Sequence, residues 1–121
     1  MKKTLLGLLG ICAVGCAHHP APNDQLASSI AAVRGAEEAG AQNVPEAALH
    51  VKLAQEEISH AKKLMEHGDN ARAEDIAMRA GNDAELAVAL ARADSAQKKL
   101  QQFAQASQAA GGESAQQGAA Q

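Results

Sequence analysis

The stretch NARAEDIAMRAGNDAELAVALA, residues 70–91, decides the fold of this chain. Alanine recurs in it at spacings of three and four residues, which places one small side chain per turn on a single face of a helix. Alanine is the best helix former, and its small size lets a neighbouring helix approach closely. We therefore expect a long helix whose alanines form a packing seam. The alanines of this seam are Ala73, Ala77, Ala80, Ala84, Ala87 and Ala91.

Larger apolar residues accompany the seam and lengthen the expected helix. They continue as far as Phe103, so the helix is expected to run from Asn70 to Ala109, about 60 Å at the α-helical rise per residue. Gly81 lies inside it and costs about 1 kcal/mol relative to alanine, so a bend or an earlier break there stays open. The flanking stripe consists of Ile76, Leu86, Leu90, Leu100 and Phe103.

A second helix is expected before residue 70. Pro45 suits the first turn of a helix, and Gly68 followed by Asp69 suits a stop and a new start. Between them, apolar residues recur at spacings of three and four, as in a coiled-coil seam. This seam contains Val51, Ala54, Ile58, Ala61 and Met65, and Leu49, Leu53 and Leu64 widen it.

A first helix is expected from Asn23 or Asp24, both good capping residues, to a stop at Gly40. Its apolar stripe contains Leu26, Ile30 and Val33. Short turns between successive helices favour antiparallel neighbours. The sequence thus predicts an all-α, up-down-up three-helix hairpin or bundle, in which the second helix covers only about the first two dozen residues of the third.

Composition supports this fold class and limits the size of the core. Alanine occupies 30 of 121 positions and aromatics amount to one phenylalanine, so little apolar area is available for burial. No stretch alternates apolar and polar residues with β-branched enrichment, which argues against strands.

The N-terminus has the pattern of a secretory signal. Lys2 and Lys3 precede an apolar stretch of 11 residues, Thr4 to Val14, which is too short to span a bilayer as a helix. Removing residues 1–15 leaves nine basic and 14 acidic residues, a net charge of −5. This negative net charge does not favour binding to nucleic acid and argues against a basic membrane-binding patch.

The residues Ala13-Val14-Gly15-Cys16 resemble the lipobox of bacterial lipoproteins, with Ala13 where leucine is commoner. The resemblance implies cleavage after Gly15 and acyl chains, such as palmitate, on Cys16. Each buried methylene contributes about 0.8 kcal/mol, so several acyl chains anchor a protein permanently. A secreted protein with a free thiol and an uncleaved hydrophobic anchor are the alternatives. Cys12 follows the bulky Ile11 and fits a cleavage site poorly.

The rest of the chain divides accordingly. Residues 16–22 are expected to be a lipidated, extended tether, because Pro20 and Pro22 disfavour helix. Residues 23–109 form the helical domain. Residues 110–121 contain no large apolar side chain and are expected to be a disordered tail.

Motifs from Gly40-Ala41 onward point to a family. They include Pro45, Gly68-Asp69 and the string Asp83-Ala84-Glu85-Leu86-Ala87. In this order, over about residues 24–95, they resemble the bacterial lipoprotein domain catalogued as domain of unknown function 4398. The resemblance implies a helical cell-envelope protein of a Gram-negative bacterium, with no established activity.

Candidate sites for chemistry are few. His18-His19 in the tether and His50, His60 and His67 in the second helix do not supply the three or four converging ligands that zinc needs. We find no Gly-rich phosphate loop, Ser-His-Asp order or CxxC pair, and we expect neither an enzyme nor a cofactor.

Asp83 interrupts the alanine seam and forms an i, i+4 ladder with Arg79 and Asp75. Such a ladder normally supports its own helix. The sharper hypothesis is that Asp83 sets the helix register or contacts a partner together with Ala80, Ala84 and Ala87.

The expected function is therefore that of a lipid-anchored lipoprotein on the periplasmic face of the outer membrane. Lipoproteins that are retained in the inner membrane resemble one another in having an aspartate directly after the lipidated cysteine. This chain has Ala17 at that position, which favours the outer membrane. The role would be structural or adaptor, through helix–helix contacts with an envelope protein or a second copy along the alanine seam. An alanine zipper resembling the major murein lipoprotein and a small metal- or ligand-binding envelope module are the alternatives.

Overall fold

The computed structural model describes the backbone of residues 19–118 and the side chains of residues 19–109. Three α-helices make up this part of the chain: α1 (Asn23–Glu38), α2 (Pro45–Glu66) and α3 (Asn70–Gly118). A short 3₁₀ turn, η1 (Ala41–Asn43), connects the first two. Between residues 19 and 118 there is no strand, so the all-helical prediction with a long third helix is confirmed.

Two glycines end the first two helices as the sequence predicts. Gly40 has φ 82° and Gly68 has φ 76°, a left-handed conformation that glycine adopts without steric cost. After α2, the Gly68 N–H donates to Met65 O at 3.0 Å and the Asp69 N–H donates to Leu64 O at 2.9 Å. This pair of bonds is the Schellman motif, which satisfies the last carbonyls of the helix.

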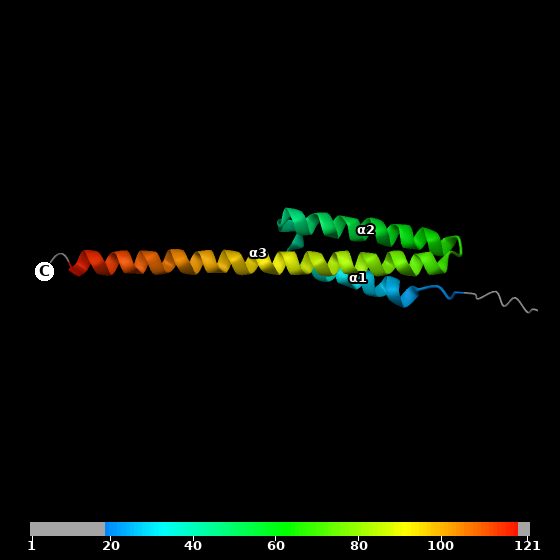
Figure 1. Cartoon of the computed structure of the whole chain (residues 1–121), viewed down its shortest axis with the longest axis horizontal. Coiled ribbons are helices and arrows are strands. Elements are labelled where there is room, and N and C mark those ends of the chain that lie inside the picture. The colour runs from blue at the N-terminus through cyan, green and yellow to red at the C-terminus, as the bar shows by residue number, and fades with distance from the viewer. Residues whose placement is uncertain (1–18, 119–121) are drawn as a thin grey trace, which may run out of the picture.

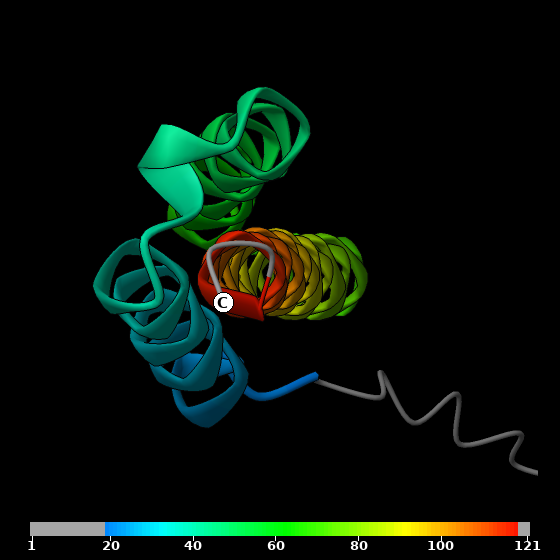
Figure 2. The same cartoon turned by 90° about the vertical axis from the view of Figure 1, so that its left-hand side faces the viewer.

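The helices lie side by side along one axis (Figure 1). α1 and α3 run in one direction, and α2 runs in the other. Viewed along the axis, the three helices stand at the corners of a triangle (Figure 2), and each contacts the other two. The most extensive contact is between α2 and α3.

The core is a thin seam of small residues faced by a few larger ones. All six alanines of the predicted α3 seam are buried, and five of them have no exposed surface. Val51, Ile58 and Leu64 of α2 and Val33 of α1 face this region as larger buried groups. Alanine lets the helix axes approach, and the larger side chains fill the remaining space.

Two details of the predicted stripes differ in the structure. Ser29 is fully buried at the centre of the α1 face, and its Oγ lies within hydrogen-bond distance of both Gln25 O and Ala77 O. Its single O–H can donate to either carbonyl, so the hydroxyl is satisfied in the core. Leu49 and Leu53 do not widen the buried seam. They are 55% and 38% exposed, because α2 turns them away from both neighbouring helices.

α3 extends farther than predicted. It has 49 residues, about 72 Å at the α-helical rise, and continues to Gly118 where the sequence predicts a stop at Ala109. No proline follows Asn70, and Glu113 to Gln117 are mostly good helix formers, so Gly111 and Gly112 weaken the helix without ending it. Helix therefore replaces the expected disordered tail over residues 110–118. Residues 119–121 lie outside the described residues.

None of the described helices combines the length and the apolar character that crossing a bilayer requires.

Candidate interaction surface

The alanine seam is buried by contacts within the chain itself. Ala80, Ala84 and Ala87 have no exposed surface and belong to the core shared with α1 and α2. A partner cannot reach these side chains while the helices are packed. If α3 binds a partner, as the sequence predicts, it must do so with other residues.

Asp83 contacts α2. Its Oδ1 accepts a hydrogen bond from His50 Nδ1 at 2.8 Å, and both side chains are about one-fifth to one-quarter exposed. The contact joins residues 33 positions apart in the sequence, so it fixes how α2 lies along α3. Of the two roles considered for Asp83, this geometry favours helix register.

Glu57 and Arg79 extend this polar cluster. Arg79 Nη2 lies 2.8 Å from Glu57 Oε1, whereas the sequence suggested that Arg79 pairs with Asp75 and Asp83 of its own helix. The Glu57 side chain is 15% exposed, and its Oε2 is buried without a hydrogen-bond partner. Burial raises the pKa of Glu57 above its ordinary value. Arg79 opposes this shift, and the nearby Asp83 adds to it.

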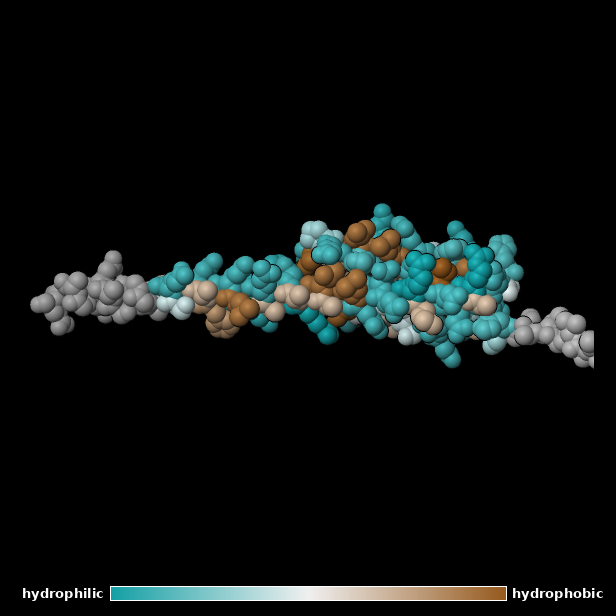
Figure 3. Space-filling model, in the orientation of Figure 1, coloured by the Kyte–Doolittle hydropathy of each residue, from teal (hydrophilic) through white to brown (hydrophobic). Residues whose placement is uncertain are grey.

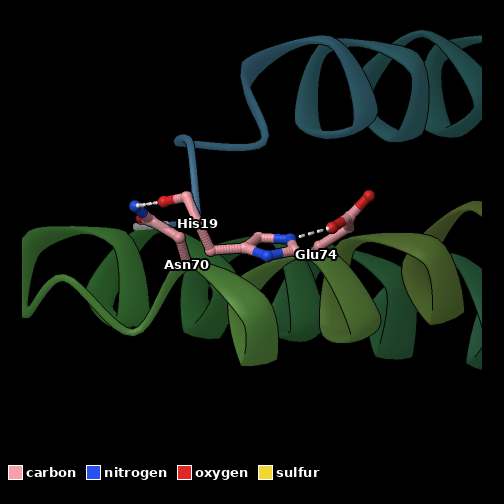
Figure 4. A network of polar contacts seen from close by, with 3 residues as sticks. All are labelled: His19, Asn70 and Glu74. Atoms are coloured by element: carbon pink, nitrogen blue, oxygen red, sulfur yellow. Dashed lines mark hydrogen bonds and ion pairs between the residues drawn. The ribbon is translucent and has the colours of Figure 1, made fainter. Parts of the chain in front are cut away.

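The first described residues of the tether are held against the start of α3 (Figure 4). His19 Nε2 lies 2.7 Å from Glu74 Oε2, and Asn70 Nδ2 donates to the His19 carbonyl oxygen at 2.7 Å. The tether is non-helical at residues 19–22, as Pro20 and Pro22 predict. Its attachment was not predicted, because these partners lie more than 50 residues away and no local pattern indicates them.

Cys16, the cleavage site after Gly15 and the signal segment lie outside the described residues. The described residues begin at His19, three positions after Cys16.

The described residues offer little for metal or ligand binding. Within residues 19–109, no three histidine, cysteine, aspartate or glutamate side chains come together as metal ligands would. A hollow of about 500 Å³ lies on α2. Its lining comes from one helix alone, so it is an open surface and cannot enclose a ligand. The lining residues are Lys52, Gln55, Glu56, Ser59, His60 and Lys63.

Beyond the end of its neighbours, α3 carries large apolar side chains in the open. Coverage by α1 and α2 ends at Ala91 and Asp94, and residues 95–109 are all exposed. Leu100 is 69% and Phe103 is 73% exposed. Figure 3 shows an apolar patch on this projecting part and another over the start of α2 and the adjacent part of α3. The sequence placed Leu100 and Phe103 in a flanking stripe but could not show that nothing in the chain covers them.

Comparison with known proteins gives one match. The model of the family described as Domain of unknown function (DUF4398) matches residues 24–103. No curated protein and no solved structure matches the chain.

Proposed function

The chain belongs to the DUF4398 family, and on this premise we propose a structural or adaptor role in the cell envelope. The protein is anchored by lipid on Cys16 to the periplasmic face of the outer membrane. Its three helices form an up-down-up unit, and the uncovered part of α3 contacts another protein or a second copy. The proposal assigns no catalytic step to the chain.

The projecting part of α3 is the observation that carries this proposal. Residues 95–118 add 24 residues, about 36 Å, beyond the packed helices. Helical stability in proteins comes mainly from packing, and this part of α3 packs on no other helix of the described chain. Exposed Leu100 and Phe103 add apolar surface that a partner helix would remove from water. The length and the exposure together support a binding role.

The position of the tether supports a defined orientation. His19 is held at the first turn of α3, and the projecting part lies at the opposite end of the molecule (Figure 1). Cys16 lies three positions before His19, a span of at most about 10 Å for an extended chain. A lipid on Cys16 would therefore keep the α2–α3 turn near the bilayer and direct the projecting part away from it.

Site-specific photo-crosslinking in cells tests the binding role. A photo-reactive residue at Gln102, in the projecting part, should give an adduct of defined mass with an envelope protein or a second copy. The same residue at Arg34, an exposed position on α1, serves as the control. Equal adducts from both positions, or none from Gln102, would contradict the role of the projecting part.

Fatty-acid labelling tests the anchor. The parent chain and Cys12→Ala should incorporate the label, and Cys16→Ala should not. Label that persists in Cys16→Ala, or is missing from the parent, would refute lipidation at this residue.

A further inference from the structure

α3 carries a second apolar line that its own chain leaves uncovered. This outer stripe consists of Leu86, Ala89, Ala93, Ala96, Leu100 and Phe103, at spacings of three and four residues. All six residues are exposed, whereas the alanine seam on the other side of the helix is buried. Helical residues at these spacings lie on one face, so the outer stripe has the geometry of a coiled-coil seam.

The two ends of the outer stripe carry opposite charge. At the projecting end, residues 95–109, which we call the tip, contain Lys98 and Lys99 and no acidic residue, a net charge of +2. The packed part, residues 19–94, contains seven basic and thirteen acidic residues, a net charge of −6. One molecule therefore presents a basic apolar tip and an acidic body.

The body also has an apolar surface beside the outer stripe, which we call the shoulder. It consists of exposed Leu49 and Leu53 of α2 and exposed Leu86 of α3. The His50–Asp83 contact holds these two segments together, because His50 follows Leu49 and Asp83 lies one turn before Leu86. Exposed Glu46 and Glu85 flank the shoulder. Figure 3 shows the apolar patches of the shoulder and the tip on the same face of the molecule.

We infer that a second copy of the chain packs antiparallel along the outer stripe, so that the tip of each copy lies on the shoulder of the other. The inference rests on the proposal that α3 acts through helix–helix contacts, and it does not depend on the lipid. Charge decides the direction: an antiparallel pair sets each +2 tip against a −6 body, whereas a parallel pair sets tip against tip and body against body.

Side-chain size fits the same direction. In an antiparallel seam centred between Asp94 and Ser95, Leu86 faces Phe103 of the second copy, Ala89 faces Leu100, and Ala93 faces Ala96. The large side chains of the tip, Leu100 and Phe103, then contact apolar side chains on the body of the second copy. Arg92 comes near Lys99 of the second copy, but these exposed charges stay in water and are screened by salt.

The antiparallel pair has twofold symmetry and is therefore a closed dimer. The tip–shoulder contact occurs twice in an isologous dimer and leaves no free seam, so the pairing does not propagate into fibres. The shared stretch, residues 86–103, is about 27 Å long, which places the interface at the low end of specific interfaces. We expect a dissociation constant on the order of micromolar that rises with salt concentration.

Disulfide crosslinking of the full chain in its own membranes tests the arrangement. Two differently tagged copies are co-expressed, one carrying Leu86→Cys and the other Phe103→Cys. We expect a mixed disulfide dimer that contains both tags. Gln105→Cys in place of Phe103→Cys is the control, because residue 105 lies on the other side of the helix and should crosslink at least tenfold less.

The other outcomes overturn the inference. A dimer of Phe103→Cys with itself that exceeds the mixed dimer would show a parallel pair, and absence of both dimers would show that the stripe does not bind a second copy. The parent chain without added cysteines is run alongside. A disulfide dimer of the parent would reveal a free thiol at Cys12 or Cys16 and contradict the anchor. The two copies then also carry Cys12→Ala and Cys16→Ala, and a mixed dimer that is still formed supports the arrangement, whereas its absence overturns it.

Charge reversal gives an independent readout. Lys98→Glu with Lys99→Glu places acidic tips against acidic shoulders and should lower the yield of the mixed dimer several-fold. Lys62→Glu with Lys63→Glu changes the net charge equally on the exposed surface of α2, away from the outer stripe, and should leave the yield unchanged. Equal losses in both variants would show that net charge alone matters and would contradict the tip–shoulder contact.

Discussion

The two parts of α3 are both rich in alanine but have opposite surroundings. Residues 70–94 pack on α1 and α2 through alanines without exposed surface, and residues 95–109 are exposed throughout, although they include the larger Leu100 and Phe103. Whether a residue of α3 is buried therefore depends on whether α1 or α2 packs against it. The covered part meets Val33, Val51 and Ile58, while nothing in the described chain reaches the projecting part.

This difference implies different sources of stability. The covered part is held by close packing, which tolerates little change in side-chain volume. The projecting part has only its helix propensity and the contacts it makes with other molecules. Substitutions in the covered part should therefore change the free energy of unfolding more than matched substitutions in the projecting part.

Enlarging an alanine should be costly only in the covered part. Ala84→Leu forces extra volume into a site without exposed surface and should destabilise the chain by about 1–3 kcal/mol. Ala109→Leu, on the exposed part, should change the free energy of unfolding by less than about 0.5 kcal/mol. Urea unfolding of the dilute protein measures both. Equal effects would mean that the seam is not closely packed.

Replacing glycine within α3 should raise global stability only in the covered part. A Cβ at Gly81 would lie 3.6 Å from Ser29 Oγ, an ordinary contact, so Gly81→Ala should stabilise by about 0.5–1 kcal/mol. Gly111→Ala should increase helicity locally without shifting the unfolding midpoint. Circular dichroism during thermal unfolding checks both variants, and destabilisation by Gly81→Ala would show that α1 and α3 approach more closely than the structure indicates.

The polar cluster makes the stability of the covered part depend on pH. Because burial raises the pKa of Glu57, the folded chain binds this proton more tightly than the unfolded chain. Stability should therefore fall as the pH rises from the ordinary value of 4.5 through the raised pKa. Glu57→Gln should lose less stability over this range, which urea unfolding at several pH values can measure.

Asp94→Asn is the control for this pH effect. Asp94 lies at the edge of the projecting part, 2.7 Å from Lys98, and the lysine is largely exposed. The variant should follow the pH profile of the parent. If Glu57→Gln also follows the parent profile, Glu57 is not the source of the pH dependence.

The smallest effect is expected at the tether. The His19–Glu74 pair is about half exposed, so His19→Ala should cost only a few tenths of a kcal/mol in global stability. Residues near His19 should nevertheless become accessible to proteases more readily in the variant. Unchanged proteolysis would show that the Asn70 contact with the His19 carbonyl alone holds the tether.

Local signals in the sequence were enough to predict the helices. Gly40, Pro45 and Gly68 act on their immediate neighbours, so the turns could be placed from residue type alone. The alanine seam was also predicted, because its spacing specifies one face of a helix. The family resemblance from the order of short motifs was confirmed by the match over residues 24–103.

Contacts between helices could not be predicted from such local patterns. The stripe residues indicate that α2 packs on α3 but do not show that Asp83 meets His50 or that Arg79 meets Glu57. The attachment of His19 depends on how the chain returns to the start of α3. The end of α3 was placed too early because a pair of glycines weakens a helix without always ending it.

Hydrogen exchange of the α3 amides at low and high protein concentration distinguishes the packed part of this helix from the part that binds another molecule. Residues 73–91 should be protected at both concentrations, as α1 and α2 are. Residues 95–107 should exchange rapidly in dilute solution and become protected as the concentration rises. Uniform protection along α3, independent of concentration, would contradict the division of this helix into a packed part and a binding part.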